Sequence, residues 1–193
     1  LRLPRQSRLL HEPTDRPVMF EFILGERKEK LLVGDEYDVS TDLKRNITRI
    51  KAFTNAGYDH CPILIKGAEF PRKQDEHQSV QTKSLNAGSI ITDRESFNRY
   101  QWPSVANCNF SLISQAGASL EGNMKFTPYS YDGILENAIG IVGYENLCYM
   151  LYDDEELLAD IFEKIGTITT EYFVKCLEYE EVGAILCNDD WGF

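Results

Sequence analysis

The sequence predicts an α/β fold in which helices cover a parallel β-sheet. Four apolar runs, at residues 18–24, 59–65, 124–129 and 182–188, are separated from one another by segments with helical spacing. Three of the four runs are continuously apolar, which is typical of strands that are buried on both faces. Parallel sheets covered by helices contain strands of this kind, whereas half-exposed strands alternate apolar and polar residues.

Turn and capping residues define the elements in the first part of the chain. Residues 18–24 lie between a proline and a glycine and predict a strand. The charged stretch GERKEKLLVGDEYDVS predicts a loop with a short helical turn. Residues 40–57 predict a helix, because Ser40 or Thr41 can cap it, Gly57 can end it, and apolar residues recur every three or four positions.

Helices dominate the prediction for the rest of the chain. Residues 66–92 are polar and predict a long loop with a hairpin, and short helices are expected at 92–103 and 109–122. Residues 133–153 predict two short helices that break near Gly143. The stretch DDEELLADIFEKIGTITTEYFVKCLEYE is the clearest helix, since two acids open it and apolar residues mark one face.

The fourth apolar run lies close to the end of the sequence. Only residues 189–193 follow it, so the helix that would cover this strand is not included. We therefore expect one domain over 1–193, with an irregular tail at 1–14, that holds about the first four βα units of a (β/α)8 TIM-type barrel. The alternative is an open, four-stranded α/β sheet with its last strand at an edge.

Charge and composition exclude several classes of partner. The net charge of −11, from 31 acids and 20 bases, argues against nucleic acid and anionic membranes, which bind basic patches. No apolar run approaches the roughly 18 residues of a membrane span, and no signal peptide is recognised. Five cysteines without a CxxC pair predict reduced thiols in a cytoplasmic protein. The three histidines lie in different elements, so no metal site is predicted.

Candidate site residues follow the predicted strands, because ligands of α/β sheets and barrels bind at the carboxyl ends of strands. Asp189 and Asp190 could hold a proton, orient a substrate N–H or bind a cation. Glu21 lies between two phenylalanines, where an acid needs a partner or a function. No catalytic residue can be assigned, and the candidate substrate-binding residues are Glu21, Ser130, Tyr131, Asp132, Asp189, Asp190 and Trp191.

Each candidate also has a structural interpretation. One of the paired aspartates can cap the next helix while the other is solvated, and Glu21 can form a salt bridge or lie at an edge. The loop Ser130–Asp132 precedes a helix that begins at a glycine, so it is either an anion site at a helix N-terminus or a cap and turn. No GxGxxG, P-loop, GxSxG, HExxH or EF-hand spacing supports a dinucleotide, nucleotide or serine-hydrolase function.

Several stretches together resemble the uroporphyrinogen decarboxylase superfamily over most of residues 13–193. They are EPTDRPVMFEF, AGYDHCPI, GILENAIGIVGYENLCYMLYDDEELLADIFEKIG and, above all, VGAILCNDDWGF, which is similar to the family's strand-end segment of an acid, a small or acidic residue, Trp and Gly. The resemblance implies the amino-terminal half of an eight-stranded barrel enzyme with its pocket at the strand ends. The family contains tetrapyrrole decarboxylases and methyltransferases that use a methylated corrinoid and a zinc-bound thiol.

The methyltransferase branch is the leading expectation, with methyl transfer from a methylcobamide to a thiol or related acceptor. The decarboxylases carry a pair of arginines after the first strand, where this chain has only Arg27 and lysines. The methyltransferases place their zinc ligands in the second half of the barrel, so no cofactor is expected within this chain. Zinc, a corrinoid and a corrinoid protein would belong to the full-length protein. Tetrapyrrole decarboxylation is one alternative, and a non-catalytic, truncated half-barrel that pairs as a homodimer is another.

Overall fold

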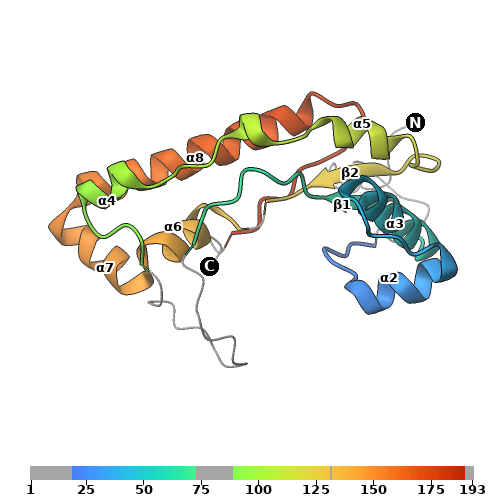
Figure 1. Cartoon of the computed structure of the whole chain (residues 1–193), viewed down its shortest axis with the longest axis horizontal. Helices are drawn as coiled ribbons and strands as arrows, with labels where there is room; N and C mark the ends of the chain where they lie inside the picture. Colours follow the sequence, from blue (N-terminus) through green and yellow to red (C-terminus); the bar gives the residue numbers. More distant parts are fainter. Residues whose placement is uncertain (1–18, 73–88, 131, 190–193) are drawn as a thin grey trace. The chain divides into compact units, whose positions relative to one another are not determined.

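The computed structural model describes residues 19–72, 89–130 and 132–189. This part of the chain is mixed α/β and mostly helical, with one two-stranded parallel sheet (Figure 1). Its strands are β1 (His60–Ile63) and β2 (Lys125–Pro128). Its helices are α2 (Glu26–Val33), α3 (Asp42–Asn55), α4 (Arg94–Arg99), α5 (Ser111–Gly117), α6 (Ile134–Val142), α7 (Tyr144–Asp153) and α8 (Glu155–Leu177), with short 3₁₀ turns η1 (Gly34–Glu36) and η2 (Val105–Asn107).

The described residues divide into two compact units, each assembled from separate stretches of the chain. Unit 1 takes its residues from Leu1–Ile65, Asn109–Tyr129 and Phe173–Leu186, and unit 2 from Lys66–Cys108, Ser130–Tyr172 and Cys187–Phe193. Helix α8 contributes residues to both units. The single domain expected over 1–193 stays a prediction. None of the described helices is both long enough and apolar enough to cross a membrane.

Unit 1 contains the sheet. β1 and β2 run parallel in the register His60↔Lys125 to Ile63↔Pro128, which confirms the strands predicted around 59–65 and 124–129, with shorter bounds. All four residues of β1 are buried, as expected for a strand covered on both faces. Helix α3 lies against β1 and also contacts α2 and α5 (Figure 1).

Residues 182–186 extend the parallel arrangement beside β2, although they form no regular strand. Isolated parallel bridges join Val182 to Phe126 and Leu186 to Tyr129. Phe126 and Tyr129 are three residues apart, whereas Val182 and Leu186 are four apart. Because the spacing is unequal, the two bridges do not belong to one regular ladder. The predicted strand at 182–188 is therefore wrong as a continuous strand, while its parallel direction agrees with the prediction.

The predicted strand at 18–24 is also wrong, because the described residues 19–24 form no strand. The Glu21 carboxylate accepts the N–H of the next residue, Phe22, at 3.0 Å. Such a local bond uses a donor that a sheet ladder would need, and it favours a bend. The segment still packs on β1, where the rings of Phe20 and His60 stack with their centroids 5.1 Å apart.

The charged stretch at 25–40 differs from the prediction of a loop with a short helical turn. It contains the eight-residue helix α2, followed by η1. Opposite charges four residues apart stabilise such a helix, and Glu26 binds Lys30 at 2.6 Å. Gly25 and Gly34 lie just outside the two ends of α2.

The predicted helices agree better with the structure. The helix predicted over 40–57 is confirmed as α3, where the Thr41 hydroxyl accepts the N–H of Lys44 at 3.2 Å. Helices α4 and α5 confirm the two short helices, and Asp93 caps α4. The predicted break at Gly143 separates α6 from α7, and its φ of +83° is rarely adopted by residues other than glycine.

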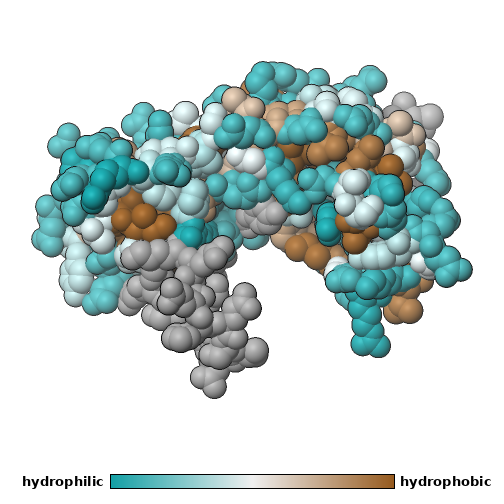
Figure 2. Space-filling view, in the orientation of Figure 1, coloured by the Kyte–Doolittle hydropathy of each residue, from teal (hydrophilic) through white to brown (hydrophobic). Residues whose placement is uncertain are grey.

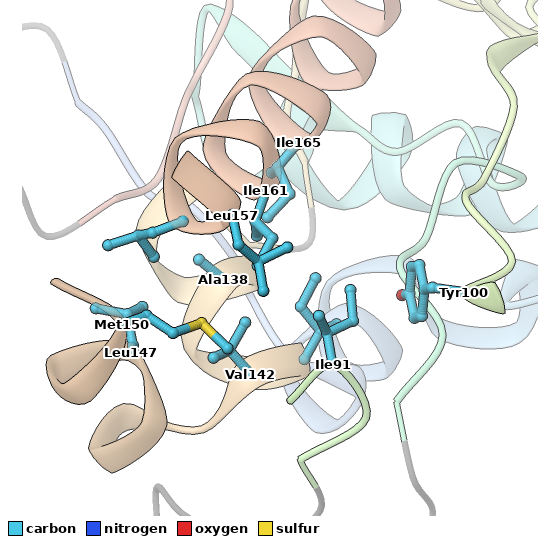
Figure 3. Packing of buried hydrophobic residues seen from close by; sticks show 11 residues of the cluster. Ile91, Tyr100, Ala138, Val142, Leu147, Met150, Leu157, Ile161 and Ile165 are labelled. Atoms are coloured by element: carbon cyan, nitrogen blue, oxygen red, sulfur yellow. The ribbon is translucent and has the colours of Figure 1, made fainter. Parts of the chain in front are cut away.

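Unit 2 has an apolar core where α6, α7 and the first part of α8 meet (Figure 3). Ile161 and Ile165 of α8 are completely buried, as are Ile141 of α6 and Ile91. The Ile141 carbonyl accepts the N–H of Ile91 at 3.1 Å, which supplies a partner at the C-terminal end of α6. The core thus fixes α6, whose other end carries the polar residues described below.

Replacement of Ile161 by alanine tests this packing. We expect Ile161→Ala to lower the free energy of unfolding by about 2–5 kcal/mol, because it leaves a cavity in a fully packed site. Urea unfolding followed by circular dichroism measures the change. Leu177→Ala is the control, since Leu177 lies on the same helix but is 54% exposed, and it should cost about 0.5 kcal/mol or less. Equal effects of the two changes would contradict the described core.

Candidate functional site

The candidate site in unit 2 is built on the N-terminus of α6. The residue before this helix is Gly133, which has no side chain to cap the first backbone N–H groups. Asp189, far along the sequence, supplies the acceptor instead. Its carboxylate accepts the N–H of Leu135 at 3.0 Å and the N–H of Glu136 at 3.4 Å. A negative charge at this end is also favoured by the helix dipole.

Glycine is required at position 133 by this arrangement. A Cβ there would overlap the Cβ and Cγ of Asp189 and would lie 2.5 Å from the Asn188 carbonyl oxygen. The Glu136 carboxylate also accepts the Gly133 N–H, at 3.3 Å. The anion that meets this helix terminus is therefore the protein's own Asp189. The sequence allowed Asp189 to be a ligand-binding residue or the cap of a following helix. In the structure Asp189 caps a helix, but the helix is α6, which precedes it in the chain.

An arginine from a distant loop completes the site. Arg72 Nη2 donates to Asp132 Oδ2 at 2.5 Å and to Asn137 Oδ1 at 3.0 Å. The Asn137 amide in turn donates to the carbonyls of Gly133 at 2.8 Å and Asp132 at 3.2 Å. Asn137 is buried, so these bonds satisfy a polar group that would otherwise be costly to bury.

The core holds Arg72 in place. Tyr100, a member of the apolar cluster, donates its hydroxyl to the carbonyl of Pro71 at 2.8 Å. Burial raises the pKa of Tyr100 although the Arg72 charge opposes the rise, so the phenol stays protonated and keeps this bond. The guanidinium also rests on Gly140, where a Cβ would lie 2.5 Å from Arg72 Cζ.

The structure brings together only some of the predicted site residues. Asp132 and Asp189 both lie at the start of α6, and Ser130 donates its hydroxyl to the Asp132 carbonyl at 2.8 Å. Glu21 belongs to unit 1, where its carboxylate binds the neighbouring Phe22 N–H. The other three predicted residues, Tyr131, Asp190 and Trp191, lie outside the described residues.

Sequence reasoning missed Arg72 and Asn137. Arg72 lies in the stretch assigned to a long loop, and only the fold brings it to Asp132. Asn137 is four residues past Gly133, and Gly140 lies three further on, so one side of the α6 pattern is small or polar. This stripe of small and polar residues beside an apolar side was the signal by which the sequence could have revealed Asn137 as a site residue.

Three of the five thiols are in surroundings that disfavour the nucleophilic thiolate. The five cysteines are not joined in disulfides, and Cys61 and Cys176 are buried. Burial raises the pKa of Cys108 to about 11, and the charge of Glu69 adds to the rise. Burial likewise raises the pKa of Cys61 and of Cys187. These three thiols are protonated at neutral pH, whereas the reactive and metal-binding form is the thiolate.

The arrangement at α6 can bind and orient a ligand. Both bonds of Arg72 use Nη2, and a guanidinium has five N–H donors, so its remaining edge can bind a carboxylate. The Arg72 side chain is 40% exposed, so solvent reaches it. Asp132 and Asp189 add acceptors for N–H or O–H groups. No protein-family model, curated protein or solved structure matches the chain.

A Gly133→Ala change tests the close contact at the start of α6. We expect it to lower the free energy of unfolding by about 1–3 kcal/mol, because the new methyl group must displace Asp189 from the helix. Thermal or urea unfolding provides the measurement.

Gly166→Ala in α8 is the matched control. A Cβ at position 166 would meet only Ile134 Cδ1, at an ordinary 3.7 Å. The substitution should therefore leave the free energy of unfolding unchanged or raise it by up to about 1 kcal/mol, because alanine favours a helix interior more than glycine does. A destabilising Gly166→Ala together with a neutral Gly133→Ala would refute the described contact.

Proposed function

We propose that the chain is the amino-terminal part of a (β/α)8 barrel enzyme of the uroporphyrinogen decarboxylase type, most similar to its corrinoid-linked methyltransferases. In this proposal the complete cytoplasmic enzyme moves a methyl group from a methylated corrinoid, free or carried by a corrinoid protein, to a thiol or related acceptor. This chain supplies residues that bind and orient a ligand.

The order of the parallel segments carries the proposal. Consecutive parts of the chain, β1, β2 and residues 182–186, lie side by side and run in the same direction. Helices separate each from the next along the sequence. Successive βα units of a barrel have this order, because each crossover returns the chain to the adjacent position. In the sequence, Ser130 and Asp132 follow β2, and Asp189 follows the third segment, as ligand-binding residues of barrels do.

Within this proposal Arg72 is the residue that contacts the ligand, and the aspartates position it. Asp132 accepts a hydrogen bond from the Arg72 guanidinium and so fixes its orientation. Asp189 caps α6, the helix against which the guanidinium lies. The guanidinium suits an acceptor that carries a carboxylate or another anionic group beside its thiol. A thiol acceptor without a charged group would not be bound more tightly because of this guanidinium.

The described residues do not fit the zinc site that methyltransferases of this type use. They contain no group of three His, Cys, Asp or Glu side chains placed to hold a metal ion. Burial also favours the protonated form of Cys61 and Cys108. In this proposal the zinc ligands would come from the second half of the barrel.

Two other functions have support. Tetrapyrrole decarboxylation would also use a cation such as Arg72 to bind substrate carboxylates.

A self-pairing half-barrel is favoured by exposed apolar residues in unit 1, where Val174, Leu177 and Ile185 are all at least 40% exposed. Figure 2 shows brown, apolar surface around α5 and β2, and pairing with a second copy could cover such surface.

Three measurements on the purified protein distinguish these functions. Anaerobic incubation of a form that includes the second half of the barrel with methylcobalamin and 3-mercaptopropionate should consume methylcobalamin if the leading proposal holds. A chelator should abolish this reaction, because the zinc ligands would lie in that second half. Release of CO₂ from uroporphyrinogen would favour the decarboxylase. A dimer by sedimentation velocity with neither activity would favour the paired half-barrel. Absence of both activities from the longest available form of the protein would refute the leading proposal.

Arg72→Met tests the ligand-binding role. We expect KM for 3-mercaptopropionate to rise about tenfold or more, because a hydrogen bond to a charged group is lost. KM for neutral 2-mercaptoethanol should not change. Arg94→Met is the matched control, since Arg94 also pairs with an aspartate, Asp160, and is similarly exposed at 42%. An equal rise for both thiols, or for both variants, would contradict the role of Arg72.

A further inference from the structure

The outer face of α7 is unusual for a helix at a protein surface. Leu147 and Met150 point into the core of unit 2. The opposite side carries Tyr144, Tyr149 and Tyr152, which are 50%, 58% and 91% exposed, together with Leu151 at 52%. At helical spacing Tyr144, Tyr149 and Tyr152 share the outward side of α7 with the exposed Glu145, and Leu151 lies at its border. The Tyr149 hydroxyl donates to the Glu145 carboxylate at 3.3 Å. We call the three tyrosines and Leu151 the α7 aromatic face.

A comparison with α2 shows that exposure alone does not explain this composition. The exposed residues of α2 include Glu26, Arg27, Lys28 and Lys30, the usual charged surface of a solvated helix. The outward side of α7 holds three tyrosines and a leucine, with Glu145 as an exposed acid among them. Tyrosine gives a large, rigid contact area with a polar tip and is enriched at protein interfaces.

The surroundings of the α7 aromatic face are acidic. Residues 126–163 contain nine Asp or Glu and no Lys or Arg. Four acids in succession, Asp153 to Glu156, follow the face directly, and all four are exposed. The nearby Arg94 is bound to Asp160 of α8.

We propose that the α7 aromatic face is a docking surface for a protein partner that carries arginine or lysine around an apolar centre. Guanidinium groups stack on tyrosine rings, and a basic rim complements the acids beside the face. A second copy of the chain would bring two acidic surfaces together, and an anionic membrane would be repelled. The inference is independent of the proposed enzymatic function, because it uses only the outward side of α7.

A designed peptide pair tests the proposal. The first peptide is an amphipathic helix with a leucine stripe flanked by arginines, and the second has glutamate in place of arginine. Fluorescence anisotropy at low and high salt measures their binding to the full chain. We expect the arginine peptide to bind at low salt, with affinity that falls as salt rises, and the glutamate peptide not to bind.

Substitutions locate the binding surface. We expect the double variant Tyr149→Ser with Tyr152→Ser to lower the affinity for the arginine peptide at least about tenfold, as loss of central interface residues does. Leu31→Ser is the control, since Leu31 is an exposed apolar residue of unit 1, at 77%, and should change binding less than about twofold. If the double variant loses helical circular dichroism, Tyr152→Lys replaces it, because the side chain is almost fully exposed and the added charge repels the peptide.

Several results would overturn the proposal. They are failure of the arginine peptide to bind at low salt, equal binding of both peptides, and equal effects of the tyrosine changes and Leu31→Ser. A dimer in sedimentation velocity that the tyrosine changes abolish would also overturn it, because it would assign the α7 aromatic face to a second copy.

Discussion

The start of α6 is the constraint on which the rest of unit 2 depends. A helix that begins at a glycine cannot cap its own first N–H groups, and here Asp189 provides the cap. The other end of the same helix is fixed by Ile141, which lies in the core and accepts a bond from Ile91. One nine-residue helix therefore joins an apolar core to a polar cluster. Its two sides differ because Gly133, Asn137 and Gly140 share one face.

This arrangement gives the acidic residues near the strand ends a structural role. Asp189 and Asp132 each accept hydrogen bonds from within the protein, so their carboxylates also hold the site together. Arg72 is the group that combines a fixed position with solvent access, at 40% exposure. Its position depends on the core through Tyr100, which binds the preceding residue. A ligand at this site would thus meet a cation whose orientation is set by packing several residues away.

The helices could be predicted from the sequence more completely than the strands or the site. Local signals were sufficient for α3, which has Thr41 as its cap, and for the break at Gly143, since capping and left-handed turns act within a few residues. The strand predicted at 18–24 failed because Glu21 binds its own neighbour. The one at 182–188 failed because this segment pairs only through two isolated bridges of unequal spacing, which a run of apolar residues does not reveal. The partnership of Arg72 with Asp132 joins residues that are far apart in the sequence, and no spacing rule could reveal it.

The two proposals use different parts of unit 2, the N-terminus of α6 and the outward side of α7. In a barrel the strand ends hold the ligand, while the helices turn their outer faces to the surroundings. The inward side of α7 is occupied by Leu147 and Met150, so a partner on its outward side need not disturb the core or the polar cluster at α6. The acids next to the α7 aromatic face then have a physical role that catalysis would not give them. They would select basic partners and speed their encounter, at a strength that falls with ionic strength.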